Sequence, residues 1–251
     1  MNLALGPEIA AIALVFARLG AALMLLPVYG EGYVLARARL LLAVALAVVL
    51  TPVIQPTLPA VAAFDARFAG LVVGEVVHGL FIGAFVRLAL MALSVAGTTF
   101  AMQMGFGMAN FFDPAAGVQG SAVGNLFTAA ALVALVLTDG HHAVLGGIVA
   151  SYTALPPGAG AGMTDMAAAM ARGSADAVAL GLQMALPMTV ASVVVYAVLG
   201  MMSRLVPTLQ VIFVAMPAQI MIGLVVVGLS LGAIIELHGA FVEDLLLRLG
   251  T

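Results

Sequence analysis

The run FAGLVVGEVVHGLFIGAFVRLALMALSVAGTTFAM, residues 68–102, constrains the architecture more than any other part of the chain. It contains no proline and is far longer than the roughly 20 residues that cross a bilayer core of about 30 Å. It also contains Glu75, His78 and Arg87, and an Arg or an acidic side chain at a bilayer centre costs about 2.5–3.5 kcal/mol on insertion scales. We therefore expect a helix that is buried mostly against protein, with lipid along only part of it.

The composition of the whole chain points the same way. Its 251 residues are 65% apolar and 8% charged, whereas soluble domains are about half apolar and a quarter charged. A water-soluble globular protein is excluded, because a soluble fold cannot bury so much apolar surface. The net charge is −3 and the eight cationic residues, all Arg, are scattered, so there is no basic face for nucleic acid. The absence of cysteine from the sequence excludes disulfides and Cys–zinc sites.

Proline and glycine divide the rest of the chain into further apolar segments, whose length and Ala and Leu content predict helices. These segments cover 8–26, 40–54, 122–138, 143–155, 175–201 and 209–235, and an amphipathic tail covers 240–249. Segments 40–54 and 143–155 are short for a membrane span, so the number of helices need not equal the number of spans. The sequence predicts an all-α, integral-membrane-type protein that is not a conventional multi-span bundle.

Glycines spaced four residues apart indicate places where helix backbones approach closely in an apolar medium. Such pairs are Gly70/Gly74, Gly79/Gly83, Gly120/Gly124 and Gly228/Gly232. Because the chain has 28 glycines, some pairs arise by chance, and each pair alone is a weak indication.

Charged residues inside the apolar segments leave functional hypotheses open beside a structural one. Glu75 and His78 lie three apart on one helix face, but metal-binding bundles need two such pairs and two further Glu, so ion pairing of Glu75 is the favoured interpretation. A transporter or channel could use buried charges together with helices broken at Pro187 and Pro217. Ion pairs within the chain or between subunits are again favoured.

The polar tetrad Asp139-Gly140-His141-His142 separates two apolar segments. Adjacent His side chains on a helix are expected to point in different directions, which favours a polar turn at an aqueous interface over a metal or proton-relay site. The serines of the chain have no nucleophile-elbow context. The sequence therefore offers no assembled active site, and we expect no enzymatic activity, no cofactor and no metal.

The segment AMQMGFGMANFFDP, residues 101–114, crowds three Met and three Phe into a stretch that glycine interrupts. Gly105 and Gly107 prevent a stable continuous helix, and Met side chains re-pack around varied shapes. A loop of this kind suits a conformable seal across an apolar constriction. The alternative is a buried loop between helices that only packs, which composition alone slightly favours.

Along essentially its whole length the sequence resembles the FliR family, which comprises membrane subunits of the flagellar export apparatus and their homologues in injectisomes. The matches follow one order, and the most specific begins at Gln103. They are Phe16-Ala17-Arg18, Pro27, Gly30, Arg37 and Arg39; Glu75, Gly79 and Gly83; Gln103-Met104-Gly105 through Ala109 to Asp113-Pro114; Asp139-Gly140-His141-His142, Ser151 and Pro156; and Ala185-Leu186-Pro187, Gly200, Ser203-Arg204, Pro207, Val211, Phe213, Pro217 and Gly223. Many relatives carry a Gly-Glu pair where this chain has Gly97 and Thr98, so no acidic role is expected there.

The resemblance implies a subunit that joins FliP-like and FliQ-like subunits in a helical export-gate assembly of stacked helical hairpins. Its implied function is to form and close the export pore of the flagellar type III system. The other implied partners are FlhB-like and FlhA-like components, unfolded export substrates and membrane lipid, with no nucleic acid among them. The implied location is the bacterial inner membrane at the flagellar basal body. A stand-alone secondary transporter or ion channel of that membrane is the alternative.

The resemblance also implies an internal organisation for a single subunit of residues 1–251. A FliP-like portion covers 1–155, a linker covers 156–174, and a FliQ-like hairpin with a short tail covers 175–251. The FliP-like portion contains a plug loop at 103–121, and its implied plug residues are Met104, Gly105, Phe106, Gly107, Met108, Phe111, Phe112, Asp113 and Pro114. Expected polar contacts within or between subunits involve Arg18, Glu75, Arg87 and Arg204.

Overall fold

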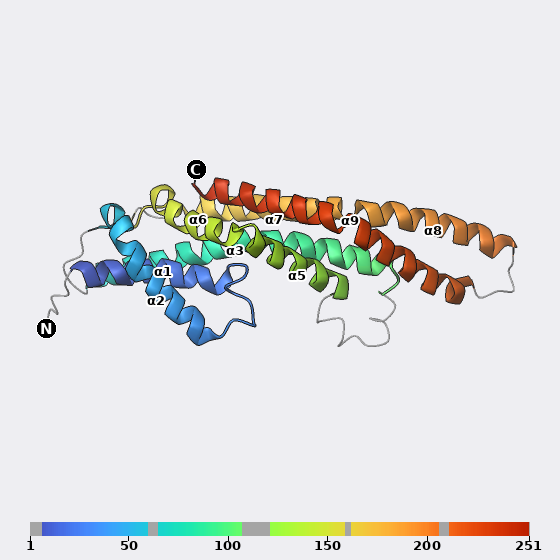
Figure 1. Ribbon diagram of the computed structural model, residues 1–251. Helices are drawn as coiled ribbons and strands as arrows, with labels where there is room; N and C mark the ends of the chain where they lie inside the picture. The colour runs from blue at the N-terminus through green and yellow to red at the C-terminus, as the bar shows by residue number, and fades with distance from the viewer. Residues whose placement is uncertain (1–6, 60–64, 107–120, 159–161, 206–210, 251) are drawn as a thin grey trace. The chain divides into compact units, whose positions relative to one another are not determined.

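The structure is a computed structural model that describes residues 7–59, 65–106, 121–158, 162–205 and 211–250 (Figure 1). The described residues form α-helices, one short 3-10 helix and connecting turns, and no strand, so the predicted all-α class is confirmed. The elements are α1 (Pro7–Leu25), α2 (Ala36–Ile54), η1 (Gln55–Thr57), α3 (Ala66–Gln103), α5 (Ala122–Leu137), α6 (Gly140–Ala154), α7 (Met163–Met184), α8 (Leu186–Leu205) and α9 (Val211–Gly250).

The chain forms two compact units, each assembled from separate segments. The first unit comprises Met1–Leu88, Leu135–Ser174 and Val242–Thr251. The second unit comprises Ala89–Ala134 and Ala175–Phe241. The long helix α3 contributes its N-terminal part to the first unit and its C-terminal part to the second.

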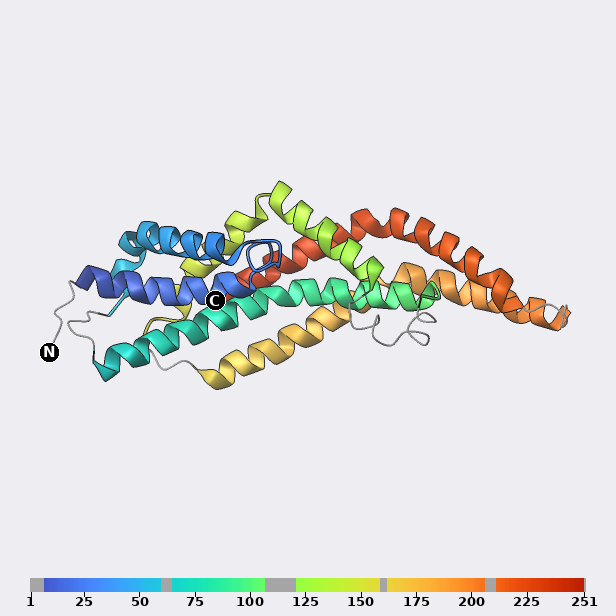
Figure 2. The same ribbon diagram turned by 90° about the horizontal axis from the view of Figure 1, so that it is seen from below.

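In the first unit, α1 and α2 lie side by side (Figures 1 and 2). Helix α2 buries one stripe of residues at helical spacing, which consists of Ala43, Ala47, Thr51 and Ile54. Ala47 and Ile54 pack with Val15 of α1 and Tyr152 of α6. Most of the remaining apolar surface of α2 is exposed, as expected for a helix that meets lipid or another subunit.

Glycine allows α3 to approach α1 closely in the same unit. A β-carbon at Gly79 would lie 2.9 Å from the β-carbon of Ala21, and one at Gly83 would lie 2.7 Å from the carbonyl oxygen of Ala22. Both distances are shorter than real side chains tolerate, so the predicted close approach at this pair is confirmed. By contrast, a β-carbon at Gly70 or Gly74 would meet no heavy atom within 4 Å.

In the second unit, α3 packs against α5. The rings of Phe100 and Phe127 meet edge to face with centroids 5.3 Å apart, and the Ser121 hydroxyl donates to the carbonyl of Gly97 at 2.9 Å. Gly97 faces Gly124 so closely that a β-carbon at 97 would lie 3.1 Å from the carbonyl carbon of Val123. A β-carbon at Gly228 or Gly232 would meet no heavy atom within 4 Å, so the prediction of close approach is wrong for that pair within the described residues.

Five described helices are long and apolar enough to cross a membrane, namely α1, the α2 region Ala36–Thr57, α3, α8 and the Ala215–Leu249 part of α9. A sixth span is possible if α5 and α6, which pass the length and hydropathy test only together, act as one broken span. Only 11% of the apolar 18-residue stretch of α8 is buried within the chain. The protein is therefore an all-α membrane protein with large apolar faces that its own described residues leave uncovered.

Several predicted segment boundaries differ from the structure. Helix α2 begins at Ala36 and not at residue 40, so the expectation that this segment is short for a membrane span is wrong. The predicted helix 175–201 is two helices, and the first begins at Met163, because an Ala-rich stretch with high helix propensity precedes the apolar run. The break falls at Ala185, so Pro187 occupies the first turn of α8, where its missing N–H needs no partner. Helix α9 continues through Pro217, so the expected break there is wrong, and the predicted tail 240–249 is the last part of the same helix.

Candidate gate segment and buried ion pair

Arg18 of α1 and Glu75 of α3 form a buried ion pair in the first unit. The guanidinium binds the carboxylate at both oxygens, with Nε to Oε2 at 2.7 Å and Nη2 to Oε1 at 2.9 Å. Arg18 is fully buried and Glu75 is 1% exposed. Paired donation by a guanidinium to a carboxylate fixes both distance and orientation, so the pair sets how α1 and α3 face each other.

Further partners of Arg18 come from the end of α6. Its Nη1 donates to the Ser151 hydroxyl at 3.1 Å, and its Nη2 donates to the carbonyl of Leu155 at 2.8 Å. The guanidinium carbon lies 3.9 Å from the centroid of the Tyr152 ring, a distance that allows cation–π attraction. One buried cation thus ties three helices together. The sequence marked Ser151 only through the family resemblance, and it gave no signal for Tyr152 or Leu155.

The same geometry argues against a metal ion at Glu75 and His78. Both carboxylate oxygens of Glu75 accept hydrogen bonds from Arg18, so a positive group already occupies the place where a cation would bind. His78 Nδ1 lies 3.8 Å from Glu75 Oε1, which is longer than a hydrogen bond. The arrangement serves as a structural contact between helices.

The other two Arg residues expected in polar contacts lie elsewhere. Arg87 is 43% exposed, places Nη2 3.6 Å from Glu31 Oε1, and donates from Nη1 to the carbonyl of Leu25 at 3.2 Å. Arg204 is exposed in the last turn of α8, and the described residues show no ion pair with it. Arg18 and Glu75 therefore form one contact. Arg87 pairs with Glu31 and takes no part in that contact, and neither does Arg204.

The candidate gate segment begins where α3 ends, in the second unit. The N–H of Gly105 donates to the carbonyl of Met102 at 3.2 Å, and the N–H of Phe106 donates to the carbonyl of Ala101 at 3.0 Å. Gly105 has φ +90°. Together these features form a Schellman motif, which ends a helix with a glycine in the left-handed region. The expected interruption of the helix at Gly105 is thus confirmed.

The predicted plug residues have different environments where the structure describes them. Met104 is fully buried, whereas Phe106 is 39% exposed. The remaining predicted plug residues, Gly107, Met108, Phe111, Phe112, Asp113 and Pro114, lie outside the described residues. Met104 therefore belongs to the packed end of α3, and Phe106 is the first residue beyond it that faces outward.

Asp139 of the polar tetrad directly precedes α6, and Gly140, His141 and His142 form the first turn of that helix. Asp139 has φ +55°, a left-handed conformation that Asp tolerates better than most residues. The rings of His141 and His142 lie with centroids 4.0 Å apart, so the expectation that these neighbours diverge is wrong, because their side chains turn toward each other. Ligand atoms of Asp139 and the two His lie within 4.8 Å of one another, but Asp139 and His142 are exposed, as in a polar turn.

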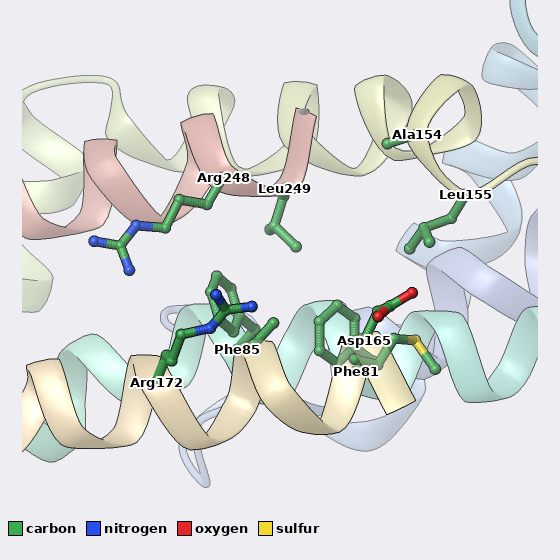
Figure 3. Close-up of a pocket in the computed structure, with 10 residues that line it drawn as sticks. Phe81, Phe85, Ala154, Leu155, Asp165, Arg172, Arg248 and Leu249 are labelled. Atoms are coloured by element: carbon green, nitrogen blue, oxygen red, sulfur yellow. The ribbon is translucent and has the colours of Figure 1, made fainter. Parts of the chain in front are cut away.

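A pocket of about 580 Å³ opens in the first unit beside the contacts of Arg18 (Figure 3). Its lining consists of Phe81, Phe85, Ala154, Leu155, Asp165, Met166, Ala169, Arg172, Arg248 and Leu249. Figure 3 shows Arg172 reaching into it from α7, and Leu155 is shared with the Arg18 network. Arg248 forms an ion pair with Asp244 at 2.7 Å. The lining described here has no hydroxyl, thiol or imidazole group, and its carboxylate is that of Asp165.

Comparison with known proteins gives one consistent result. Residues 9–245 match the family described as bacterial export proteins, family 1. A flagellar biosynthetic protein FliR of Caulobacter vibrioides is 34% identical over 88% of this chain and 88% of its own length. Proteins of the same name from Bacillus subtilis and Aquifex aeolicus are 28% and 26% identical over 86% and 82% of this chain, and over 83% and 79% of their own lengths.

Proposed function

Because the chain belongs to the FliR family of bacterial export proteins, we propose that it joins FliP-like and FliQ-like subunits to form and close the flagellar export pore. The match across residues 9–245 carries this proposal, since it includes both the buried ion pair and the candidate gate segment. Family membership makes the chain a membrane component of the flagellar export apparatus that works with other export components. The specific partners, the pore and its closure are the proposal.

Uncovered apolar surface supports a role in an assembly. Val190, Val193 and Val194 of α8 are each more than half exposed, as are Leu224 and Leu229 of α9. Contiguous apolar surface of this kind marks contacts with protein or lipid. FliP-like and FliQ-like subunits would cover part of these faces, and lipid of the bacterial inner membrane at the flagellar basal body would cover the rest.

Closure of the pore is assigned to the segment that begins at Phe106. The Schellman motif ends α3 at Gly105, so the chain leaves the helix where the Met- and Phe-rich sequence begins. Apolar side chains there would exclude water and ions by packing and dewetting. Opening would move the segment aside for an unfolded substrate, while FlhA-like and FlhB-like components select and drive the substrate. We assign the chain no catalytic reaction.

Purification from the native membrane tests the assembly. We expect a tagged copy of the chain to bring FliP-like and FliQ-like subunits with it in a defined complex, and deletion of the chain to abolish secretion of flagellar proteins. A stable lone chain that transports a small solute or ion after reconstitution would instead support a stand-alone transporter or channel. Normal secretion in the deletion strain would refute the proposal.

A further inference from the structure

Three helices of the first unit meet at one level. Arg87 of α3 donates from Nη1 to the carbonyl of Leu25, the last residue of α1, at 3.2 Å. In the first turn of α2, Arg39 donates from Nη1 to Sδ of Met24 at 3.7 Å. The end of α1 and the start of α2 therefore lie beside Arg87. We call this level, marked by Leu25, Ala36 and Arg87, the arginine end of the unit.

The opposite end of the same helices lies one bilayer thickness away. From Ala66 to Arg87, α3 rises about 33 Å at 1.5 Å per residue, and a bilayer core is about 30 Å thick. The α2 region Ala36–Thr57 contains 22 residues and has the same length. Near the starts of α3 and α1, Phe68 packs with Ala10, so these two helices share their other end as well.

Positive charge exceeds negative charge at the arginine end. Arg37 is exposed in the first turn of α2, and the described residues show no ion pair with it. Arg39 donates from Nη2 to the backbone carbonyl of Glu31 at 3.1 Å, and Arg87 lies 3.6 Å from the Glu31 carboxylate. Three guanidinium groups thus accompany the single carboxylate of this cluster, which leaves an excess of positive charge.

An exposed apolar surface continues from the arginine end along α2. Tyr33, just before this helix, is 67% exposed, and Tyr is enriched at the level where a membrane meets water. Exposed aliphatic side chains then follow one another along the helix, at Leu41, Val44, Val48, Val49 and Val53. An apolar surface of bilayer length that ends in positive charge fits both parts of an anionic phospholipid, its acyl chains and its headgroup.

We propose that Arg37 and Arg39, together with Tyr33, bind the headgroup of an anionic phospholipid whose acyl chains lie along α2. Guanidinium groups pair strongly with phosphate. A protein partner on this face would have to supply an apolar surface of bilayer length and an acidic group at one end, whereas an anionic phospholipid has both. The proposal rests on the lipid contact that the proposed function includes, and not on the pore or its closure.

Fluorescence quenching beside the cluster measures which lipid occupies it. The chain has no native cysteine, and a β-carbon at the exposed Gly32 meets no heavy atom within 4 Å. A fluorophore is therefore attached to Gly32→Cys in the complete export complex, whose other subunits are made free of cysteine. The complex is reconstituted in bilayers of phosphatidylcholine or phosphatidylglycerol that carry a nitroxide near the headgroup.

We expect phosphatidylglycerol to quench the label at Gly32→Cys at a lower concentration than phosphatidylcholine does. Gly70→Cys is the matched control, because it is equally open and lies near the opposite end, where the charges of Asp65 and Arg67 balance. No preference between the lipids is expected there. Equal quenching by both lipids at Gly32→Cys, an equal preference at Gly70→Cys, or no quenching because a subunit covers the site would each overturn the proposal.

Substitution of Arg37 provides the second measurement. Arg37→Gln should weaken the preference for phosphatidylglycerol about fivefold, the effect of one arginine near an anionic surface, whereas Arg37→Lys should retain most of it. Arg67→Gln, which removes an exposed arginine at the opposite end, should change nothing at Gly32→Cys. An unchanged preference in Arg37→Gln would overturn the site. Quenching requires only the chain in a membrane, whereas secretion tests the pore, so the two failures are distinguishable.

Discussion

The two ends of α3 are fixed by different chemistry. In the first unit, Glu75 binds a fully buried Arg18 that also contacts Ser151, Leu155 and Tyr152. In the second unit, Gln103 at the end of the helix forms hydrogen bonds with Gln219 and Thr189. Gly223 of α9 leaves room there for the side chain of Met104. Removing one partner of a buried ion pair leaves an uncompensated charge, whereas neutral contacts are weaker. The first region therefore depends on a buried pair of charges, and the second depends on neutral contacts.

Loss of half of the ion pair should have the greatest consequence. Arg18→Met leaves the Glu75 carboxylate buried without its partner, and we expect a loss of about 3–5 kcal/mol in stability. Thermal unfolding of the purified complex and the amount of chain in membranes would both show it. Adding Glu75→Leu to Arg18→Met should recover much of the loss, since two apolar residues replace the pair. If the double variant lost as much stability as the two single variants combined, the buried ion pair would not be the source of the effect.

Close approach of α1 and α3 should be the next most sensitive feature. Gly79→Ala places a methyl group against the α1 backbone, and overpacking of this kind costs about 1–3 kcal/mol. Gly70→Ala on the same helix is the matched control, because it meets no heavy atom within 4 Å. Unfolding midpoints of the two complexes should differ, with Gly79→Ala the less stable. Equal midpoints would mean that the two helices can separate without penalty.

The neutral region should respond more weakly to loss of one hydrogen bond. Gln219→Ala removes the donor to the Gln103 carbonyl, and we expect a loss of about 1–2 kcal/mol because a buried acceptor loses its partner. Gln183→Ala in the same unit is the control, since Gln183 is exposed. Unfolding midpoints give the comparison. A loss as large as that of Arg18→Met would remove the distinction drawn between the two regions.

The exposed ion pair of Arg87 should matter least to stability. Its side chain is 43% exposed and lies 3.6 Å from Glu31, and such pairs contribute about 0–1 kcal/mol. Arg87→Gln should therefore leave the unfolding midpoint of the complex nearly unchanged. If Arg87→Gln instead lowered the free energy of unfolding by several kcal/mol, as expected for a buried pair, then solvent exposure would not explain the difference between the Arg87 and Arg18 ion pairs.

Sequence patterns predicted the helices well where one apolar run corresponded to one helix. Hydropathy located α1 and α3, and Gly105 marked the end of α3 because its special backbone conformation needs glycine. The start of α7 was missed, since Asp165 and Arg172 interrupt hydropathy without interrupting helix propensity. Continuity of α9 beyond Pro217 was missed because a proline signal is local, whereas packing decides whether the helix continues.

Long-range partners lay beyond sequence reasoning. The sequence predicts that Glu75 pairs with an Arg or with a partner subunit, but it does not identify Arg18, which is 57 positions away and has no local feature that distinguishes it from other Arg residues. The role of Gln219 was missed because a single amide has no periodicity or motif, and only the fold brings it to the Gln103 carbonyl. The resemblance implies Met104 as a plug residue, and the sequence has no feature that predicts the full burial of its side chain at the end of α3.

Ion leak through the assembled complex is the decisive measurement for closure by the gate segment. Phe106, Met108, Phe111 and Phe112 are replaced together by Ala in a complex that still contains its FliP-like and FliQ-like partners. The account predicts that this variant makes the membrane permeable to small ions, because the seal depends on bulky apolar side chains. Unchanged permeability in a fully assembled complex would contradict it.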